Sequence, residues 1–149
     1  MARVIGRDEA EALELLGAVG VRLHAATGEP AEADPTLVEA VLADDSRQVR
    51  AVADIAVPAD VDAGMGAWHV NAVDELHVVR SGEGIMEFVT VDGVVSVVVG
   101  AGDVIEIHGT EHRYRPLTAQ RWVLRHSGGP AADLAATQTG RGAQEWPTA

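Results

Sequence analysis

Histidines and acidic residues gather in two short stretches in the second half of the sequence. The first stretch holds His69, Asn71, Glu75 and His77, and the second ends at His112. Residues two apart on a β-strand share a face, so extended segments would place His69 beside Asn71 and Glu75 beside His77. A turn between Asn71 and Glu75 would bring both pairs into one cavity, and His112 would enter it from just past a second tight turn.

Two neutral imidazoles and one carboxylate form a common ligand set for Fe²⁺, Ni²⁺, Mn²⁺ or Zn²⁺ and leave positions open for water, substrate or oxygen. The spacing therefore fits a divalent metal held by His69, Glu75 and His112. A single histidine on a strand is more often structural or solvated, and such spacing also arises by chance. The pattern alone leaves both interpretations open.

The first third of the chain, residues 1–53, has the pattern of helices. Asp8 is a suitable cap for a helix over residues 9–17. Asp34-Pro35 has the form of a second helix start, with an apolar stripe that ends near Asp44 or continues through residues 46–52. The sequence therefore predicts N-terminal helices ahead of the histidine-containing segments.

Residues 54–126 have the pattern of short strands separated by glycine-containing turns. Asp92-Gly93 between two valine-rich runs is a strong hairpin signal. We expect strands at residues 67–71, 75–80, 84–91, 94–99, 103–107, 112–115 and 121–126. Strands at this spacing indicate a closed barrel or a sandwich. We expect residues 127–149 to form an irregular, partly mobile tail, and residues 1–149 to form one domain.

The chain carries 23 acidic and 11 basic residues, which gives a formal net charge of −12. So acidic a surface repels phosphate backbones, and we expect no nucleic-acid partner. The absence of cysteine excludes disulfides, thiolate metal sites and a cysteine nucleophile. No apolar run has the length of a membrane span, and the opening residues lack the apolar core of a signal peptide. We therefore expect a cytoplasmic protein with no membrane partner.

Two motifs resemble those of the cupin superfamily. Residues 69–84 are similar to its first motif, a His-x-His-x-x-x-Glu run that closes with Gly82-Glu83-Gly84. Residues 102–112 are similar to its second motif, a Gly-Asp strand followed by a turn and a histidine. More narrowly, several segments spread over the chain resemble the acireductone dioxygenases. This resemblance implies a mainly β, single-domain cupin, a double-stranded β-helix or jelly-roll barrel, with N-terminal helices.

The resemblance also implies roles for individual residues. His69, Glu75 and His112 match three of the four metal ligands of the family, and Asp74 matches an acid that acts as a base on the substrate. The family binds Fe²⁺ or Ni²⁺. Asn71 stands where the family has a second histidine, and His77 stands where it has an arginine that faces the substrate. We expect either His77 or the amide oxygen of Asn71 to complete the coordination.

Three functions follow as expectations. The first is a metal-dependent oxidoreductase, a dioxygenase acting on a small enediol-like molecule, with Asp74 and His77 as its catalytic residues. The second is a non-redox metal-dependent cupin enzyme, such as a lyase, isomerase or cyclase, which the altered ligand set favours. The third is a cupin that binds a small ligand without catalysis. The sequence leaves a homodimer open.

Four arginines and four large apolar residues surround these motifs. Arg80, Arg113, Arg115 and Arg125 would either line the cavity mouth and attract an anionic substrate or lie on solvated strand faces, which is commoner. We expect the apolar set to pack the core of the barrel; its members are Trp68, Met86, Phe88 and Trp122.

Overall fold

The computed structural model describes residues 2–25, 49–126 and 136–149. These residues form mainly β-strands with one α-helix and one short 3-10 helix. In chain order the elements are β1 (Arg3–Ile5), α1 (Glu9–Ala18), β2 (Val21–Ala25), β3 (Val49–Ile55), η1 (Gly64–Gly66), β4 (His69–Asn71), β5 (Asp74–Ser81), β6 (Glu83–Thr90), β7 (Gly93–Gly100), β8 (Asp103–His108), β9 (His112–Pro116), β10 (Gln120–His126) and β11 (Ala136–Gln138).

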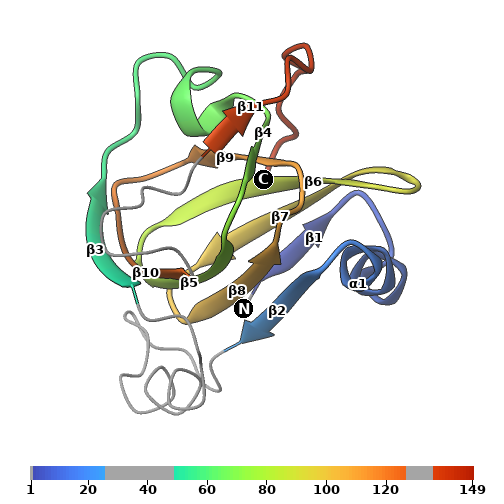
Figure 1. Ribbon diagram of the computed structural model, residues 1–149, viewed down its shortest axis with the longest axis horizontal. Helices are drawn as coiled ribbons and strands as arrows, with labels where there is room; N and C mark the ends of the chain where they lie inside the picture. The colour runs from blue at the N-terminus through green and yellow to red at the C-terminus, as the bar shows by residue number, and fades with distance from the viewer. Residues whose placement is uncertain (1, 26–48, 127–135) are drawn as a thin grey trace.

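The strands make two antiparallel sheets that form a sandwich (Figure 1). The six-stranded sheet has the order β1-β7-β6-β9-β4-β11, and the five-stranded sheet has the order β2-β8-β5-β10-β3. The main core lies between them, because its buried residues come from both sheets and from α1. In both sheets, strands from distant parts of the sequence lie side by side. Strands β4 and β5, which carry the first motif, are therefore flanked by β9 and β11 and by β8 and β10.

Alternation along the strands decides which side chains enter the space between the sheets. In β5, Glu75 and His77 point inward, whereas Leu76 and Val78 belong to a separate buried cluster on the other face of the five-stranded sheet. Because successive side chains of a strand point to opposite faces, the polar residues of the first motif share the inner face.

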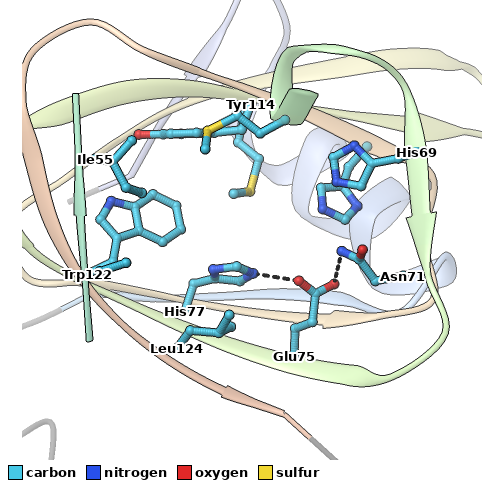
Figure 2. Close-up of a pocket in the computed structure, with 12 residues that line it drawn as sticks. Ile55, His69, Asn71, Glu75, His77, Tyr114, Trp122 and Leu124 are labelled. Carbon is cyan, nitrogen blue, oxygen red and sulfur yellow. Dashed lines mark hydrogen bonds and ion pairs between the residues drawn. The ribbon is translucent and has the colours of Figure 1, made fainter. Parts of the chain in front are cut away.

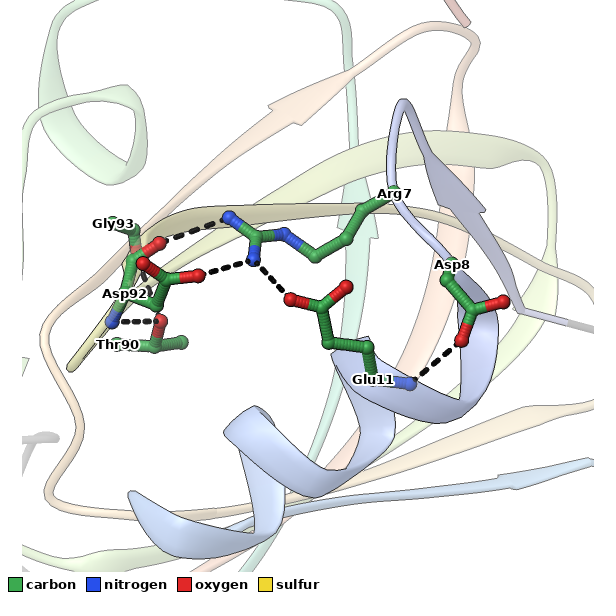
Figure 3. A network of polar contacts seen from close by, with 6 residues as sticks. All are labelled: Arg7, Asp8, Glu11, Thr90, Asp92 and Gly93. Carbon is green, nitrogen blue, oxygen red and sulfur yellow. Dashed lines mark hydrogen bonds and ion pairs between the residues drawn. The ribbon is translucent and has the colours of Figure 1, made fainter.

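Helix α1 covers the edge of the core beside β1 and β2 (Figure 1). It begins after Asp8, whose side chain accepts a hydrogen bond from the backbone N–H of Glu11 at 3.0 Å (Figure 3). Ala12 and Leu16, four residues apart, are fully buried on its inner face. Gly20, at φ 87°, lets the chain leave the helix and enter β2.

The turn Gly82-Glu83-Gly84 needs both of its glycines. Gly82 has a φ of 76°, and a Cβ there would lie 2.3 Å from the carbonyl oxygen of Ala119. A Cβ on Gly84 would lie 2.0 Å from the hydroxyl oxygen of Tyr114. The glycine pair therefore allows β6 to pass close to the β9–β10 segment.

The expected strands after residue 66 are all present, with ends shifted by one or two residues, and the hairpin at Asp92-Gly93 joins β6 to β7. The expected helix over residues 9–17 is α1. The second expected helix, from Asp34-Pro35, lies outside the described residues, and the jelly-roll order of the strands stays a prediction. No helix among the described residues is long and apolar enough to cross a membrane.

Two expectations about the ends of the chain are wrong. Residues 1–53 are not uniformly helical, since β1, β2 and most of β3 lie there. Residues 49–52 in particular do not continue a helix; they pair with β10. Residues 127–149 are not irregular throughout, since residues 136–138 form β11 beside β4.

Candidate functional site

A cavity of about 240 Å³ lies between the two sheets, at the end where β4 meets β9 (Figure 2). All five residues predicted as metal ligands line it. One part of the wall is polar and the other is apolar. The polar part consists of His69, Asn71, Glu75, His77 and His112; the apolar and aromatic part consists of Ala53, Ile55, Met65, Met86, Tyr114, Trp122 and Leu124. The turn after Asn71 thus brings the two inward-facing pairs together as predicted.

The two imidazoles of His69 and His112 lie opposite one another on paired strands. They are register partners across β4 and β9, and their ring centroids are 4.4 Å apart. Each Nδ1 lies 2.7 Å from a backbone carbonyl oxygen, that of Ala67 for His69 and that of Thr110 for His112. A carbonyl only accepts, so each Nδ1 donates its proton and each Nε2 keeps its lone pair. Imidazoles that bind metals are commonly oriented in this way.

Asn71, Glu75 and His77 form a hydrogen-bonded row along the cavity floor (Figure 2). The Nδ2 of Asn71 donates to one carboxylate oxygen of Glu75, and the Nε2 of His77 donates to the other, each at 2.9 Å. Among the described residues, Asn71 Oδ1 and His77 Nδ1 are buried and have no hydrogen-bond partner. Buried polar atoms usually have a partner, so these two atoms are candidates for contact with a bound group.

The row and the histidine pair set the charge at this end of the cavity. Burial raises the pKa of Glu75, but hydrogen bonds from His77 and Asn71 and the nearby imidazoles outweigh it, so this pKa lies below its ordinary value. Burial lowers the pKa of His112 to about 4, although the Glu75 carboxylate opposes that shift. Near neutral pH, Glu75 is therefore an anion beside a neutral His112, the forms that a metal ion requires of both ligands.

Asp74 lies outside this cluster. Its side chain is exposed on the outer face of β5, and its carboxylate lies 3.1 Å from Nδ1 of His108. The alternation that turns Glu75 inward turns its neighbour outward. A base at position 74 would not face a substrate inside the cavity.

Several lining residues were not foreseen. Leu124 could have been found from the alternation that places it on the same face as Trp122, two residues earlier. Ile55 belongs to β3, where it alternates with the exposed Asp54 and could have been found in the same way, whereas Met65 belongs to the three-residue η1, which has no such signal. Trp122 and Met86, expected as core residues, are buried but also line the cavity.

None of the four arginines considered for the cavity mouth is among the described lining residues. Arg113 is instead buried on the outer face of β9, where it forms an ion pair with Glu87. The described wall therefore contains no fixed positive charge.

The donor types fit a divalent metal, but they are not gathered around an ion. Within the described ranges, no group of three or more His, Asp or Glu side chains is placed to hold a metal as it stands. Both oxygens of Glu75 instead accept hydrogen bonds from Asn71 and His77. Two free imidazole Nε2 atoms, an ionised carboxylate and an unpartnered amide oxygen nevertheless make a chemically suitable set.

No protein-family model and no curated protein matches the sequence. A comparison of folds gives a clear match to an acireductone dioxygenase from Bacillus anthracis, solved with a cadmium ion in its active centre. The TM-score is 0.56 and the sequence identity is 17%, and the match covers 84% of this chain and 90% of the other. The motif resemblance and the three-dimensional comparison therefore agree on the fold, which this chain shares with that acireductone dioxygenase.

Proposed function

We propose that the protein is a metal-dependent enzyme of the dioxygenase type that acts on a small enediol-like substrate. The observation that carries this proposal is the histidine pair. His69 and His112 present free Nε2 atoms to one cavity, beside the ionised Glu75, in a fold shared with a metal-containing dioxygenase. Neither backbone-anchored imidazole has to change its tautomer to bind a metal.

We assign the metal to His69, His112, Glu75 and the amide oxygen of Asn71. Oδ1 of Asn71 and Nδ1 of His77 are both unpartnered, and we prefer Asn71 as the fourth ligand because it lies two residues from His69 on the same face of β4. When bound, an Fe²⁺ or Ni²⁺ ion, or alternatively Mn²⁺ or Zn²⁺, would act as a Lewis acid on the oxygens of the substrate.

His77 is the residue that we propose as the base, in place of Asp74. Its Nε2–H is held by the carboxylate of Glu75 at 2.9 Å, which leaves Nδ1 as the basic nitrogen. Its ring makes a T-shaped contact with Trp122, with centroids 5.0 Å apart, and this contact restrains the ring plane. An imidazole oriented by a carboxylate is a common arrangement for removing a proton from a hydroxyl group.

The cavity wall also bears on the substrate. Ile55, Trp122 and Leu124 lie on the side away from His69 (Figure 2), and Met65, Met86 and Tyr114 add further apolar and aromatic surface. A wall without a fixed cation favours a ligand with an uncharged, apolar body and a polar end directed at His69 and His112. The cavity volume of about 240 Å³ restricts this ligand to a small molecule.

Elemental analysis of protein purified without a metal-affinity tag tests this proposal. We expect near-stoichiometric Fe, Ni, Mn or Zn in the wild type and its loss in His112→Ala. His24→Ala is the matched control, because His24 is exposed and pairs with Glu106 away from the cavity. Oxygen consumption with small enediols then tests the reaction. Absence of metal in the wild type, even after incubation with each ion, would refute the proposal.

A non-redox lyase, isomerase or cyclase is the second candidate, and Asn71 is the observation that favours it. An amide oxygen is a harder donor than imidazole and suits Lewis-acid chemistry better than chemistry that depends on the redox state of the metal. Stoichiometric metal without oxygen consumption would favour this candidate. A cupin that only binds a ligand would turn over no substrate in either assay.

A further inference from the structure

The strand that carries His69 and Asn71 is held mainly by the C-terminal segment. Strand β4 has three residues, and His69↔His112 is the register pair that joins it to β9. On its other edge all three residues pair with β11, from Asn71↔Ala136 to His69↔Gln138. Figure 1 shows β11 lying along β4 at the edge of the six-stranded sheet.

The chain beyond β11 ties together the residues that precede the two histidines. The backbone N–H of Thr139 donates to the carbonyl oxygen of Trp68, which precedes His69, at 3.0 Å. The guanidinium of Arg141 binds the carboxylate of Glu111, which precedes His112. Its Nε and Nη2 donate to the two carboxylate oxygens at 3.0 and 2.9 Å. Each histidine therefore has its preceding residue fastened to the same short segment.

The same segment also covers the residue that follows His112. The guanidinium of Arg113 lies 3.7 Å from the ring centre of Trp146 and 4.9 Å from that of Trp68. Its Nη2 donates to the carbonyl oxygen of Gln144 at 3.1 Å, and the indole N–H of Trp146 donates to Asp62 at 2.9 Å. The ring of Trp146 thus covers one face of the buried Arg113 guanidinium, and Arg113 directly follows His112 in the sequence.

No residue of this segment is among the described residues that line the cavity. Its action on the site must therefore pass through Trp68, Glu111 and Arg113, whose backbones carry the two histidines. A bidentate arginine–carboxylate contact and a stacked arginine both depend strongly on orientation, so they restrict rotation as well as separation.

We propose that residues 136–146 are a positioning element for the candidate site, with Arg141 and Trp146 as its positioning residues. They hold His69 and His112 at the spacing needed to share one ligand. The geometric part of this inference stands on the contacts alone; its consequence for metal binding rests on the proposed function.

Nuclear magnetic resonance of the metal-free protein tests the geometric part. Ring protons of His69 and His112 should show a mutual nuclear Overhauser effect in the wild type, because their ring centroids are 4.4 Å apart. We expect this signal to be weakened or lost in Arg141→Ala and largely restored in Arg141→Lys. Trp146→Ala and Trp146→Phe form the second pair, with the same expected loss and restoration.

Arg7→Ala is the matched control. Arg7 also joins two segments through exposed ion pairs, but its partners Glu11 and Asp92 are remote in sequence from either cavity histidine. It should leave the histidine signal unchanged. Should Trp146→Ala fail to fold, the Arg141 pair decides alone, since Arg141 is exposed and Glu111 keeps its hydrogen bond from the Thr139 hydroxyl when the arginine is removed.

A Co²⁺ titration followed by visible absorption tests the consequence for binding. We expect roughly 10- to 100-fold weaker binding in Arg141→Ala than in the wild type, with partial recovery in Arg141→Lys. An unchanged histidine signal and unchanged Co²⁺ affinity in Arg141→Ala would overturn the inference. If the wild type gives the histidine signal but binds no Co²⁺, the metal proposal is refuted. The positioning inference is then tested by the histidine signal in the Arg141 and Trp146 variants alone.

Discussion

Two arginines near the surface, the half-buried Arg7 and the exposed Arg141, join distant segments of this sandwich in chemically similar ways. Arg7 binds Glu11 in α1 and both the side chain and the backbone carbonyl of Asp92 at the β6–β7 hairpin (Figure 3). Arg141 binds the carboxylate of Glu111 with two nitrogens. Each network lies on the surface, so each ion pair contributes little to stability by itself.

The two networks differ in what stands next to them. The Arg7 network joins a helix to a hairpin whose neighbouring residues are solvent-exposed, Val91 and Gly93 among them. Beside the Arg141 network lie the buried Arg113 and the two cavity histidines. Two contacts of similar strength can thus differ in consequence, because only one of them orients residues that a ligand would touch.

The largest change in stability should come from removing Arg113, the buried cation that contacts the C-terminal segment. Arg113→Ala would leave the buried Glu87 without its charged partner, and we expect the free energy of unfolding to fall by about 4 kcal/mol. Urea denaturation measures this change. Arg113→Met combined with Glu87→Gln should recover much of the loss, because no unpaired charge then remains. A loss below about 1 kcal/mol in Arg113→Ala would mean that the cation is no more important than Arg7.

A core substitution under α1 should separate stability from the site. Leu16 is fully buried, and Leu16→Ala should lower the free energy of unfolding by about 3 kcal/mol. The ring-proton signal between His69 and His112 should remain, because α1 lies away from the cavity wall. Loss of that signal in a folded Leu16→Ala protein would show that the two sides of the molecule are coupled.

As the pH falls, protonation of groups in the cavity should lower the free energy of unfolding before any effect of acid on α1 does. The pKa of His112 is about 4 in the folded protein, below its ordinary value, so the imidazole stays neutral while the unfolded chain binds a proton. The stability of the metal-free protein should therefore fall as the pH falls from 6.5 towards 4, by at most about 3 kcal/mol. The lowered pKa of Glu75 adds a further loss at lower pH, with the same sign.

Denaturation curves between pH 6.5 and 5 isolate the histidine, because Glu75 stays ionised in that range. His112→Gln should flatten the slope of stability against pH there. A slope equal to that of the wild type would assign the pH dependence to another group.

The smallest effect should be that of Arg7→Ala. Removing its exposed ion pairs should change the free energy of unfolding by about 0.5 kcal/mol, and 1 M salt should abolish the difference. Thermal melts at low and high ionic strength measure it. A difference above 2 kcal/mol would mean that the network fixes α1 more firmly than its exposure indicates.

The sequence was most informative where alternation and turns coincide. Strands β4 to β10 and the meeting of the five polar residues in one cavity follow from residues that share a strand face. By contrast, β11 consists of exposed Ala, Thr and Gln residues and has no apolar alternation to reveal it. The contacts of Arg141 and Trp146 join residues far apart in the chain, so no local pattern could indicate them.

The outward position of Asp74 shows the opposite case, in which a motif placed a residue correctly in sequence but not in space. Likeness to a family motif assigned it a chemical role, whereas strand geometry turns it to the outer face beside His108. His77, whose type departs from the motif, is the residue that faces the cavity. For these two residues, the direction of the side chain on its strand indicated which one faces the cavity better than the match to the family motif did.

The edge position of β3 bears on how such a cavity could change over evolutionary time. Strand β3 is last in its sheet, pairs with β10, and turns Ala53 and Ile55 into the cavity while Val52 and Asp54 face solvent. Inserting or deleting one residue before β3 could shift its register by one and exchange these faces. The wall would then gain a carboxylate without any substitution in β4, β5 or β9. Ligand preference could thus diverge through small length changes while the histidine pair stays intact.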